Sequence, residues 1–377
     1  MTKIIMHIAE APGGVERYLV TLLTKLKQYP EYEHILVCSN TFNKDKFKGI
    51  VKEIVVVDSM HNAISVLADS KAVLAVRKVI KHYKPDIVYC HSSKAGAIGR
   101  MANFGIKNKL IYNAHGWAFN MKGASSKKIK AYVGIERMLA SMADRIICIS
   151  EYEKKSALEH KICKVEKLVV INNGIDFDEC NNLNTKCRSE MGIPDEAVVV
   201  GMIGRLTKQK SPDIFVKMAA VVKKQIQNAF FVVVGDDIGD GKQRSVIESM
   251  IAKAGLKDCF LITGWVDNPL DYATCFDVAV LLSRWEGFGL VIPEYMLLGK
   301  PIVATNADAI PYVVGDAGII VNVDDFRAAA ESVIIICSDA NCRNMLISRG
   351  KERVKMFDVQ RTANKHKAVF DSFIGQW

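Results

Sequence analysis

A glycine-rich turn between a predicted strand and a predicted helix is the segment of this sequence best suited to bind a ligand. The apolar run at residues 278–282 is typical of a buried strand, and the apolar spacing at residues 295–298 is typical of a helix. Between them, Gly287 and Gly289 allow the backbone to approach a bound group closely. The backbone amides that open the helix at Leu290 favour an anion such as a phosphate.

Two acidic residues flank this turn, with seven residues between them. Glu286 precedes the turn and Glu294 lies inside the predicted helix, so a ligand across the helix end would contact both. Solvated surface carboxylates are the ordinary interpretation of such residues. The apolar side chains of Phe288, Leu290 and Val291 argue against a plain surface loop. We therefore expect the pair to bind a ligand at the carboxyl end of a strand.

Two basic residues follow another predicted strand, at residues 197–203. Arg205 and Lys210 precede a helix and carry positive charge at the end of this strand. Cations in that position can bind a diphosphate. Ordinary surface charge is the alternative interpretation.

The first half of the chain has two comparable junctions. Gly13 and Gly14 follow a predicted strand at residues 3–9, which favours close approach to a ligand, although a tight turn would also explain them. His115 follows a predicted strand at residues 109–114 and suits a hydrogen bond to a ligand. Lone histidines are more often structural, so spacing alone does not decide the role of His115.

Length and composition favour two domains. The chain has 377 residues, more than one hydrophobic core usually supports, and half of them are hydrophobic. No apolar run approaches the ~18 residues that span a bilayer, and residues 3–9 are too short for a signal peptide. We therefore expect a cytoplasmic protein. The ten cysteines lack the spacing of a metal site and are expected to be small buried side chains without disulfides.

The net charge of +10 is unevenly distributed. Residues 1–175 contain 28 Lys and Arg against 15 Asp and Glu, whereas the remainder contains 23 against 26. This asymmetry predicts an anionic partner for the first half, such as a membrane surface, a phosphate-bearing acceptor or nucleic acid. Lys127, Lys128 and Lys130 precede apolar residues at helical spacing, which suits a helix at an anionic interface or, equally, one with a solvated basic end.

Strand-like runs alternate with helical patterns along the whole chain. This alternation predicts α/β domains with parallel sheets covered on both faces. The predicted strands, besides those named above, are at residues 34–39, 53–58, 86–91, 145–150, 168–172, 230–235, 261–266 and 301–304.

The segment from Glu286 to Glu294 resembles the E-x7-E element of retaining, nucleotide-sugar-dependent glycosyltransferases of the GT-B type, the family called GT4. Residues 204–211, with the sequence GRLTKQKS, are similar to that family's G-R-L-x-x-x-K-G pattern, with Ser211 in place of the last glycine. One segment departs from the family. Residues 308–312 read DAIPY where relatives usually show G-G-x-P-E, so no role is transferred to that loop.

The resemblance implies the GT-B fold, in which two Rossmann-like parallel-sheet domains face a central cleft and a C-terminal helix crosses back to the first domain. The expected acceptor-side domain comprises residues 1–175 together with a crossing helix at 357–377. The expected nucleotide-sugar domain comprises residues 176–356.

The resemblance also implies roles for individual residues. His115 and Glu286 would hydrogen-bond the donor sugar, and Glu294 would hold the ribose of the nucleotide. Arg205 and Lys210 would stabilise the departing diphosphate. The other implied positions are Gly13, Gly14, Val266, Gly287, Phe288, Gly289 and Leu290 for the donor, and Glu16, Arg17 and Lys94 on the acceptor side.

The expected reaction is metal-independent transfer of a sugar, with retention, from a nucleotide-diphosphate sugar to a hydroxyl group. UDP is the favoured nucleotide, and the favoured acceptor is a lipid-linked glycan in capsule or lipopolysaccharide synthesis at the inner face of the membrane. The D-x-D triplet at residues 176–178 lies at the expected domain boundary without an acidic cluster, so no metal or other cofactor is expected.

Two other functions stay open at this stage. A nucleotide-sugar epimerase shares the architecture but needs further acid and base carboxylates, for which no motif is visible. A non-catalytic nucleotide-sugar-binding protein would have little use for all four charged residues. Nucleic-acid binding is not expected, because no interleaving of aromatic and basic residues accompanies the charge.

Overall fold

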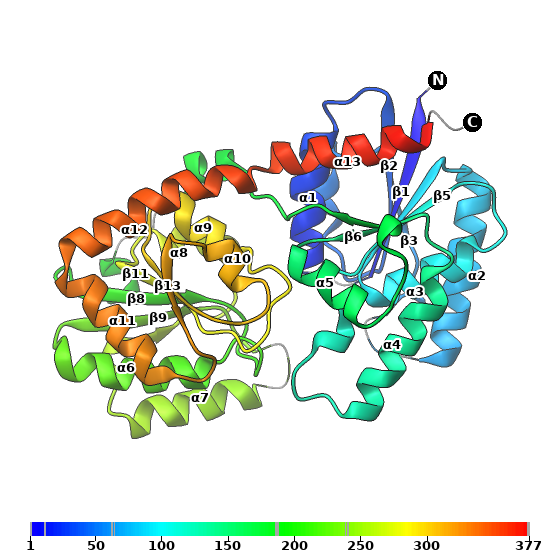
Figure 1. Ribbon diagram of the computed structural model, residues 1–377. Helices are drawn as coiled ribbons and strands as arrows, with labels where there is room; N and C mark the ends of the chain where they lie inside the picture. Colours follow the sequence, from blue (N-terminus) through cyan, green and yellow to red (C-terminus); the bar gives the residue numbers. More distant parts are fainter. Residues whose placement is uncertain are drawn as a thin grey trace. The chain divides into compact units, whose positions relative to one another are not determined.

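The computed structural model describes residues 2–10, 13–61, 63, 65–184, 188–237, 239 and 241–374. The chain divides into two units (Figure 1). Unit 1 comprises Met1–Gly174 and Val359–Trp377, and unit 2 comprises Ile175–Asp358. The chain therefore leaves unit 1 once and returns to it for its last helix.

Unit 1 is built on a seven-stranded parallel sheet in the order β3-β2-β1-β4-β5-β6-β7. Its strands are rich in β-branched residues and buried on both faces, as expected for a parallel sheet between helices. They are β1 (Lys3–Ala9), β2 (Tyr32–Cys38), β3 (Glu53–Val56), β4 (Ile87–His91), β5 (Lys109–Asn113), β6 (Arg145–Cys148) and β7 (Leu168–Val170).

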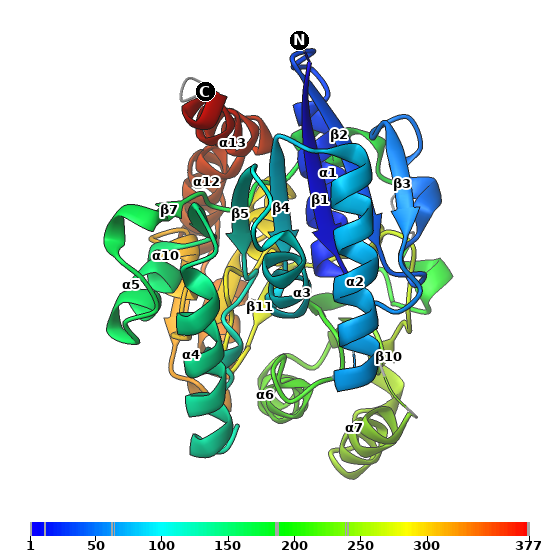
Figure 2. The ribbon, with the colours of Figure 1, turned by 90° about the vertical axis from the view of Figure 1, so that its right-hand side faces the viewer.

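Helices cover both faces of this sheet (Figure 2). One hydrophobic core lies under α2 (Val66–Tyr83), α3 (Ser93–Asn103), α4 (Ser126–Ala140) and α5 (Glu151–Glu159). The other lies under α1 (Gly14–Leu26) and α13 (Val359–Ile374), where Leu19 and Phe370 are fully buried. The last helix is thus an integral part of unit 1.

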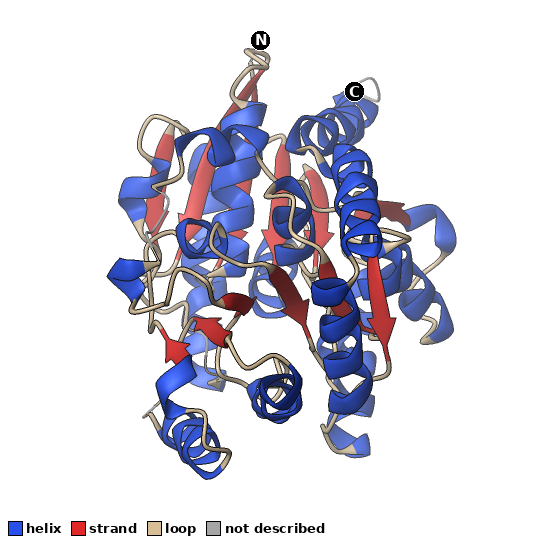
Figure 3. Cartoon of the chain, turned by 90° about the vertical axis from the view of Figure 1, so that its left-hand side faces the viewer, coloured by secondary structure: helices blue, strands red, loops and turns tan. Residues whose placement is uncertain are grey.

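Unit 2 has a six-stranded parallel sheet in the order β10-β9-β8-β11-β12-β13. Figure 3 distinguishes the strands of the chain from its helices by colour. Its strands are β8 (Val198–Ile203), β9 (Ala229–Val234), β10 (Phe260–Ile262), β11 (Val278–Leu281), β12 (Ile302–Thr305) and β13 (Gly318–Val321). Its helices are α6 (Pro212–Gln225), α7 (Lys242–Lys253), α8 (Pro269–Ala273), α9 (Val291–Leu297), α10 (Ile310–Val314), α11 (Phe326–Ser338) and α12 (Ala340–Arg353).

Both sheets have the Rossmann strand order, so the expectation of two Rossmann-like parallel-sheet domains is confirmed. The order reverses between β1 and β4 in unit 1, and between β8 and β11 in unit 2. In such sheets, ligands bind at the carboxyl ends of the strands beside the reversal. The two reversal points are therefore where functional side chains should gather.

In unit 2, the strands at the reversal point separate early. β8 and β11 pair only through Val200 with Val278 and Gly201 with Ala279. Beyond that pairing, the amide of Ile203 donates to the hydroxyl of Tyr295 at 2.7 Å. The side chain from α9 thus replaces a strand partner, and the carboxyl ends of β8 and β11 are available to other groups.

Candidate functional site

A buried ion pair lies at the reversal point of unit 2. Nζ of Lys210, from the loop after β8, donates to Oε1 of Glu286, from the loop after β11, at 2.6 Å. The two side chains are 14% and 9% exposed. Gln209 donates to the second carboxylate oxygen of Glu286 at 3.0 Å. The carboxylate is therefore held on both sides in one orientation, as a group that binds a ligand must be.

Asp308 fixes the backbone of the same loop. Its carboxylate accepts a hydrogen bond from the amide of Glu286 at 2.9 Å. Asp308 has a φ of 50°, in the left-handed region that Asp tolerates better than most residues. It occupies the first position at which relatives usually carry glycine. The segment that departs from the family pattern therefore holds the backbone of Glu286 in place.

The turn that follows Glu286 is tightly packed. Gly289 has a φ of 84°, and a Cβ there would lie 3.2 Å from side-chain atoms of Ile292 and Leu281. Phe288 is 2% exposed and packs edge-on against Phe357, with 5.5 Å between ring centroids. The segment is therefore not a solvated surface loop.

Glu294 lies inside α9, which begins at Val291, directly after Leu290. It is 2% exposed, and Glu286 is 7% exposed. Burial of two acidic residues at the end of one strand excludes the surface-carboxylate interpretation. In such sheets ligands bind beside the reversal of strand order, which is where these carboxylates lie.

Arg205 differs from the other basic residues at this edge. It is exposed, and within the described residues its side chain makes no hydrogen bond or ion pair. Arg284, by contrast, is fixed to Asp213 and Asp324, each at 2.7 Å. Arg205 therefore remains available for an anionic ligand, whereas Arg284 ties loops of unit 2 together.

A close backbone approach shapes the loop that carries Arg205. Gly235, at the end of β9, has a φ of 140°, and a Cβ there would lie 2.3 Å from the carbonyl oxygen of Gly204. Gly235 also bridges to Gly264 after β10, two residues before the half-buried Val266. Val266 and Arg205 thus share the carboxyl edge of the sheet with Lys210 and Glu286.

In unit 1, the expected glycine turn opens α1. Gly13 is the N-cap with a φ of 87°, and no other part of the described chain comes within 4 Å of a Cβ built on Gly13 or Gly14. The neighbouring Arg17 is half-buried on α1. The turn is therefore open on the side where a ligand would approach.

Two expected acceptor-side residues have structural partners in unit 1. Glu16 is 5% exposed, pairs with Lys46 at 3.1 Å and accepts from the amide of Asn43 at 3.0 Å. Lys94 pairs with Asp69 at 2.9 Å, which links α3 to α2. These contacts explain both residues without a ligand, so their assignment to the acceptor stays a prediction.

His115 lies just beyond the carboxyl end of β5. Its φ is 52°, its amide donates to Oδ1 of Asn113 at 2.9 Å, and its Nε2 lies 3.1 Å from Nδ1 of His91. The ring of Tyr18 packs edge-on against it at 4.5 Å. Burial lowers the pKa of His115 to about 3, so the imidazole is neutral near pH 7. It is suited to hydrogen bonding and not to carrying a positive charge.

The structure therefore places the expected residues in two groups, each described within its own unit. Three residues that contribute to the geometry were not among those expected: Gln209, Asp308 and Tyr295. Gln209 and Asp308 lie within the two segments compared with the family pattern, residues 204–211 and 308–312. Tyr295 lay in the predicted helix, where nothing in the spacing marks its hydroxyl.

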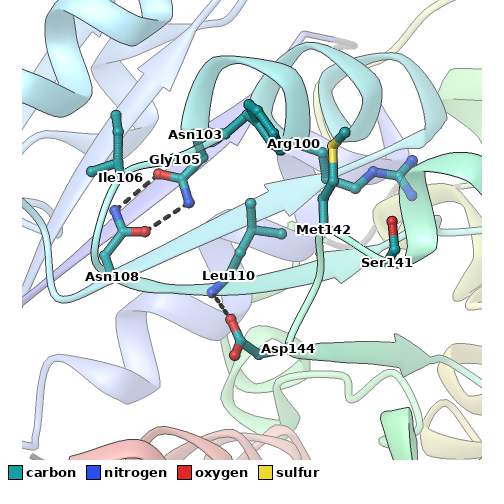
Figure 4. A pocket seen from close by; sticks show the side chains of 10 residues that line it. Arg100, Asn103, Gly105, Ile106, Asn108, Leu110, Ser141, Met142 and Asp144 are labelled. Atoms are coloured by element: carbon teal, nitrogen blue, oxygen red, sulfur yellow. Dashed lines mark hydrogen bonds between the residues drawn. The ribbon is translucent and has the colours of Figure 1, made fainter.

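A separate cavity of about 280 Å³ lies at the opposite edge of the unit 1 sheet (Figure 4). Two of its polar side chains pair with each other, since the amides of Asn103 and Asn108 form reciprocal hydrogen bonds of 2.7 and 2.9 Å. Asp144 accepts from the amide of Leu110 at 2.8 Å. Its position near the amino ends of β5 and β6 separates it from the candidate site.

None of the described helices is long and apolar enough to cross a membrane.

Family models match both units. Residues 12–179 match the model described as Glycosyltransferase Family 4, and residues 184–353 match the one described as Glycosyl transferases group 1. The sequence is 32% identical over 340 residues to an uncharacterized 41.2 kDa protein of the cps region of Klebsiella pneumoniae, covering 87% of this chain and 88% of that protein.

A second relative has a named activity. The sequence is 28% identical over 373 residues to an Escherichia coli UDP-Gal:alpha-D-GlcNAc-diphosphoundecaprenol alpha-1,3-galactosyltransferase, with 94% of each chain covered. Among solved structures, the fold is similar to that of Anabaena Alr3699/HepE in complex with UDP and glucose. The TM-score is 0.81 at 20% identity, and the match covers 99% of this chain and 100% of that one.

Proposed function

This chain is a glycosyltransferase of family 4, and on that basis we propose that it transfers a sugar from a UDP-sugar to a hydroxyl of a lipid-linked glycan, with retention at the anomeric carbon. The observation that carries the proposal is the buried Lys210–Glu286 pair at the reversal point of unit 2. An oriented carboxylate beside an ammonium group matches a ligand that is polar on one side and anionic on the other, as a nucleotide-diphosphate sugar is.

The charges at this edge support a nucleotide-diphosphate sugar as the donor. Arg205 and Lys210 would stabilise the negative charge that develops on the departing diphosphate, and Glu286 would accept hydrogen bonds from hydroxyls of the sugar. Glu294 would accept hydrogen bonds from the ribose. The E. coli relative is named for a UDP-galactose donor and the Anabaena protein was solved with UDP, which supports UDP over other nucleotides.

The proposed reaction balances without a covalent intermediate on the protein. The bond between the anomeric carbon and the diphosphate oxygen breaks, and a bond to the acceptor oxygen forms on the same face of the sugar. The proton of the acceptor hydroxyl moves to the diphosphate oxygen. His115, being neutral, hydrogen-bonds the sugar. Closure around the donor would exclude water and limit hydrolysis.

The acceptor is proposed from the relatives and from the charge of unit 1. The E. coli relative is named for a diphosphoundecaprenol-linked acceptor, and the Klebsiella relative for the capsule region of its genome. We therefore propose a role in capsule or other surface polysaccharide synthesis. On α4, Lys127, Lys128 and Lys130 are exposed, and so are Ile135 (45%) and Met138 (63%). A helix of this composition suits peripheral contact with the inner face of an anionic membrane.

The test is a donor panel. The full chain is incubated in EDTA with UDP-, GDP-, ADP- and dTDP-sugars and a synthetic polyprenyl-diphosphate-linked sugar, and release of each nucleoside diphosphate is measured. The proposal expects acceptor-dependent release of UDP, and a product whose new linkage has, by NMR, the anomeric configuration of the donor sugar. Release from another nucleotide alone overturns the donor, and a requirement for added metal overturns metal independence.

Two variants separate the proposed roles. Arg205→Ala is expected to lower kcat, because its charge acts on the leaving group, whereas Glu294→Ala is expected to raise KM for the donor. Lys208→Ala, an exposed lysine in the same loop, is the control. Normal donor affinity and turnover in both variants would refute these assignments.

A further inference from the structure

Four histidine rings in unit 1 form one continuous hydrogen-bonded chain. Nδ1 of His34 lies 3.0 Å from Nε2 of His7, and Nδ1 of His7 lies 3.1 Å from Nε2 of His91. Nδ1 of His91 lies 3.1 Å from Nε2 of His115. We call these residues the histidine chain. Every link joins an Nδ1 to the Nε2 of the next ring, so the chain has a direction and two distinct ends.

Strand register produces this arrangement. His34 lies on β2, His7 on β1 and His91 on β4, three neighbouring strands that pass under α1 and α13. His34 is paired with Ile5 and His91 with Ala9, each two residues from His7 along β1. All three side chains therefore point to the same face and their rings lie on a diagonal across the sheet. The diagonal ends at His115, the candidate sugar ligand.

The four rings are neutral. Burial lowers the pKa of His34 to about 4 and of His115 to about 3, and it lowers the pKa of His7 and His91 well below the ordinary value. A neutral imidazole has one N–H donor and one acceptor nitrogen. Each of the three links needs one N–H group and one bare nitrogen. Since each neutral ring has only one of each, all four rings must donate in the same direction along the chain. Either every Nδ1 carries a proton, or every Nε2 does.

The far end of the chain decides between these two states. Nε2 of His34 is buried and has no hydrogen-bond partner in the described part of the chain. If every Nε2 carried a proton, a buried N–H donor would remain unsatisfied at this atom, and such donors are the rarer and more costly exception in proteins. If every Nδ1 carries a proton, only an acceptor lone pair remains there. The second state is favoured.

We propose that the histidine chain holds His115 in the tautomer with its proton on Nδ1, so that His115 meets a ligand as a neutral hydrogen-bond donor. His34, His7 and His91 act through His115 and are positioning residues. Nδ1 of His115 makes no hydrogen bond to the rest of the described chain, so it is the atom left to donate. The tautomer follows from unit 1 alone. The step to a sugar oxygen as acceptor rests on the proposed function.

His366 supplies an internal reference. Its Nδ1 lies 2.8 Å from the carbonyl oxygen of Thr362, which can only accept, so Nδ1 of His366 carries the proton. Its Nε2 receives hydroxyl contacts of 3.0 Å from Tyr18 and Tyr89. His366 is therefore fixed independently of the histidine chain.

The first test measures the tautomers directly in the unliganded full chain. Histidine labelled with ¹⁵N distinguishes protonated from bare ring nitrogens by NMR. At pH 7, the four members of the histidine chain should all show a protonated Nδ1 and a bare Nε2, as His366 does. A protonated Nε2 on His115, or an imidazolium anywhere in the chain, overturns the proposal.

Substitution of His91 separates positioning from packing. His91→Phe keeps a ring, which in the native chain lies 4.1 Å from that of Tyr89, but removes the donor to His115. His91→Asn loses the ring but places an amide donor near the position of Nδ1. The proposal expects His115 to lose its fixed Nδ1 proton in the Phe variant and to keep it in the Asn variant. A Phe variant that retains the native tautomer overturns the proposal.

Kinetics then link the tautomer to the ligand. Loss of one neutral donor should raise KM for the donor about tenfold in His91→Phe, with rescue in His91→Asn. A packing role predicts the opposite order, because Phe preserves more of the ring contacts. If the tautomer changes and KM does not, the histidine chain stands and the contact of His115 with the sugar is overturned. If the unsubstituted chain binds no nucleotide sugar but the spectra agree, it is the proposed function that fails.

Discussion

The two units share a strand order and differ in chemistry at the point where that order reverses. In unit 1, the carboxyl ends of β1 and β4 are joined by Glu10, which accepts from the hydroxyl of Ser92 and from the amide of Ala95 at 3.1 Å. Neutral imidazoles fill the face beside them. In unit 2, the same position between β8 and β11 holds the ion pair of Lys210 and Glu286. All eight histidines of the sequence fall in unit 1.

The strand order therefore determines where a site can form in each unit, and the side chains at that point determine its chemistry. The neutral imidazole rings of unit 1 suit uncharged hydroxyl groups, which are common to sugars. A charged edge suits a diphosphate. The two units should therefore differ in how their stability and activity respond to acid, to loss of a buried charge and to loss of a single hydroxyl.

The largest expected effect is acid unfolding of unit 1 ahead of unit 2. Five histidines, His7, His34, His91, His115 and His366, have pKa values lowered by burial from the ordinary 6.5. Below pH 6.5 the unfolded chain binds protons that the folded unit does not, so stability falls as the pH falls towards about 4. For His34, His115 and His366, the lowered pKa destabilises the folded state by about 2 kcal/mol per residue at pH 5.

Hydrogen exchange between pH 7 and 5, corrected for the intrinsic effect of pH, measures this difference. Peptides from β1, β2 and β4 should lose protection at a higher pH than peptides from β8, β9 and β11. Equal loss in both units, or earlier loss in unit 2, would contradict the comparison.

The next effect concerns a buried ion pair of unit 1 that lies away from the reversal point of the sheet. Arg100 pairs with Glu136 at 2.9 Å, with side-chain exposures of 0% and 5%. Tyr112 donates to the other oxygen of Glu136 at 2.7 Å. Glu136→Ala should lower the free energy of unfolding of unit 1 by about 3–5 kcal/mol, because it leaves a buried guanidinium without its carboxylate.

Hydrogen exchange in peptides of β4, β5 and α4, measured in increasing urea, reports this loss for unit 1. Glu136→Gln is the control, since an amide keeps an acceptor for Tyr112, and its effect should be smaller. A Glu136→Ala protein as stable as the parent would show that the pair contributes nothing to unit 1.

In unit 2, removal of the buried cation should affect catalysis more than stability. Lys210→Ala is expected to lower kcat about 10²–10³-fold, the range for loss of one preorganised donor to a charged transition state. Lys208→Ala, exposed in the same loop, is the matched control. Initial rates of UDP release measure both, and equal turnover in the two variants would remove Lys210 from the site.

The smallest effect tests the separation of β8 and β11. Tyr295→Phe leaves the buried amide of Ile203 without its 2.7 Å acceptor, which should lower the stability of unit 2 by about 1–3 kcal/mol. Tyr272→Phe is the control, because the hydroxyl of Tyr272 makes no hydrogen bond within the described residues. A loss of stability no greater than that of the control would mean that Ile203 finds another acceptor.

Much of the fold was predictable because buried parallel strands are continuous apolar runs. β1 has the predicted bounds, and most other strands agree within two residues. β10 is shorter than predicted, ending at Ile262, because Gly264 turns the chain with a φ of 78°. β13, with only four residues at Gly318–Val321, was not predicted.

The site was predictable only where its residues are near one another in the sequence. Glu286 and Glu294 flank one turn, and their burial agrees with the apolar character of that turn. The histidine chain joins residues separated by 27, 84 and 24 positions, so only strand order and register bring them together. The partners of Glu16 and Lys94 could not be predicted either, because their ion pairs with Lys46 and Asp69 depend on how helices distant in sequence pack together.

The junction between the units has a consequence for how this polypeptide is put together. A Cβ on Gly174 would lie 2.5 Å from the Cα of Val359, so the outgoing and returning segments touch where they leave unit 1. In sequence, unit 2 is thus inserted into unit 1 at a single point, as in tolerated domain insertions. A unit 1 chain that stops at Gly174 would lack α13 and expose the apolar surface around Leu19, whereas one spliced directly from Gly174 to Val359 would retain its complete core.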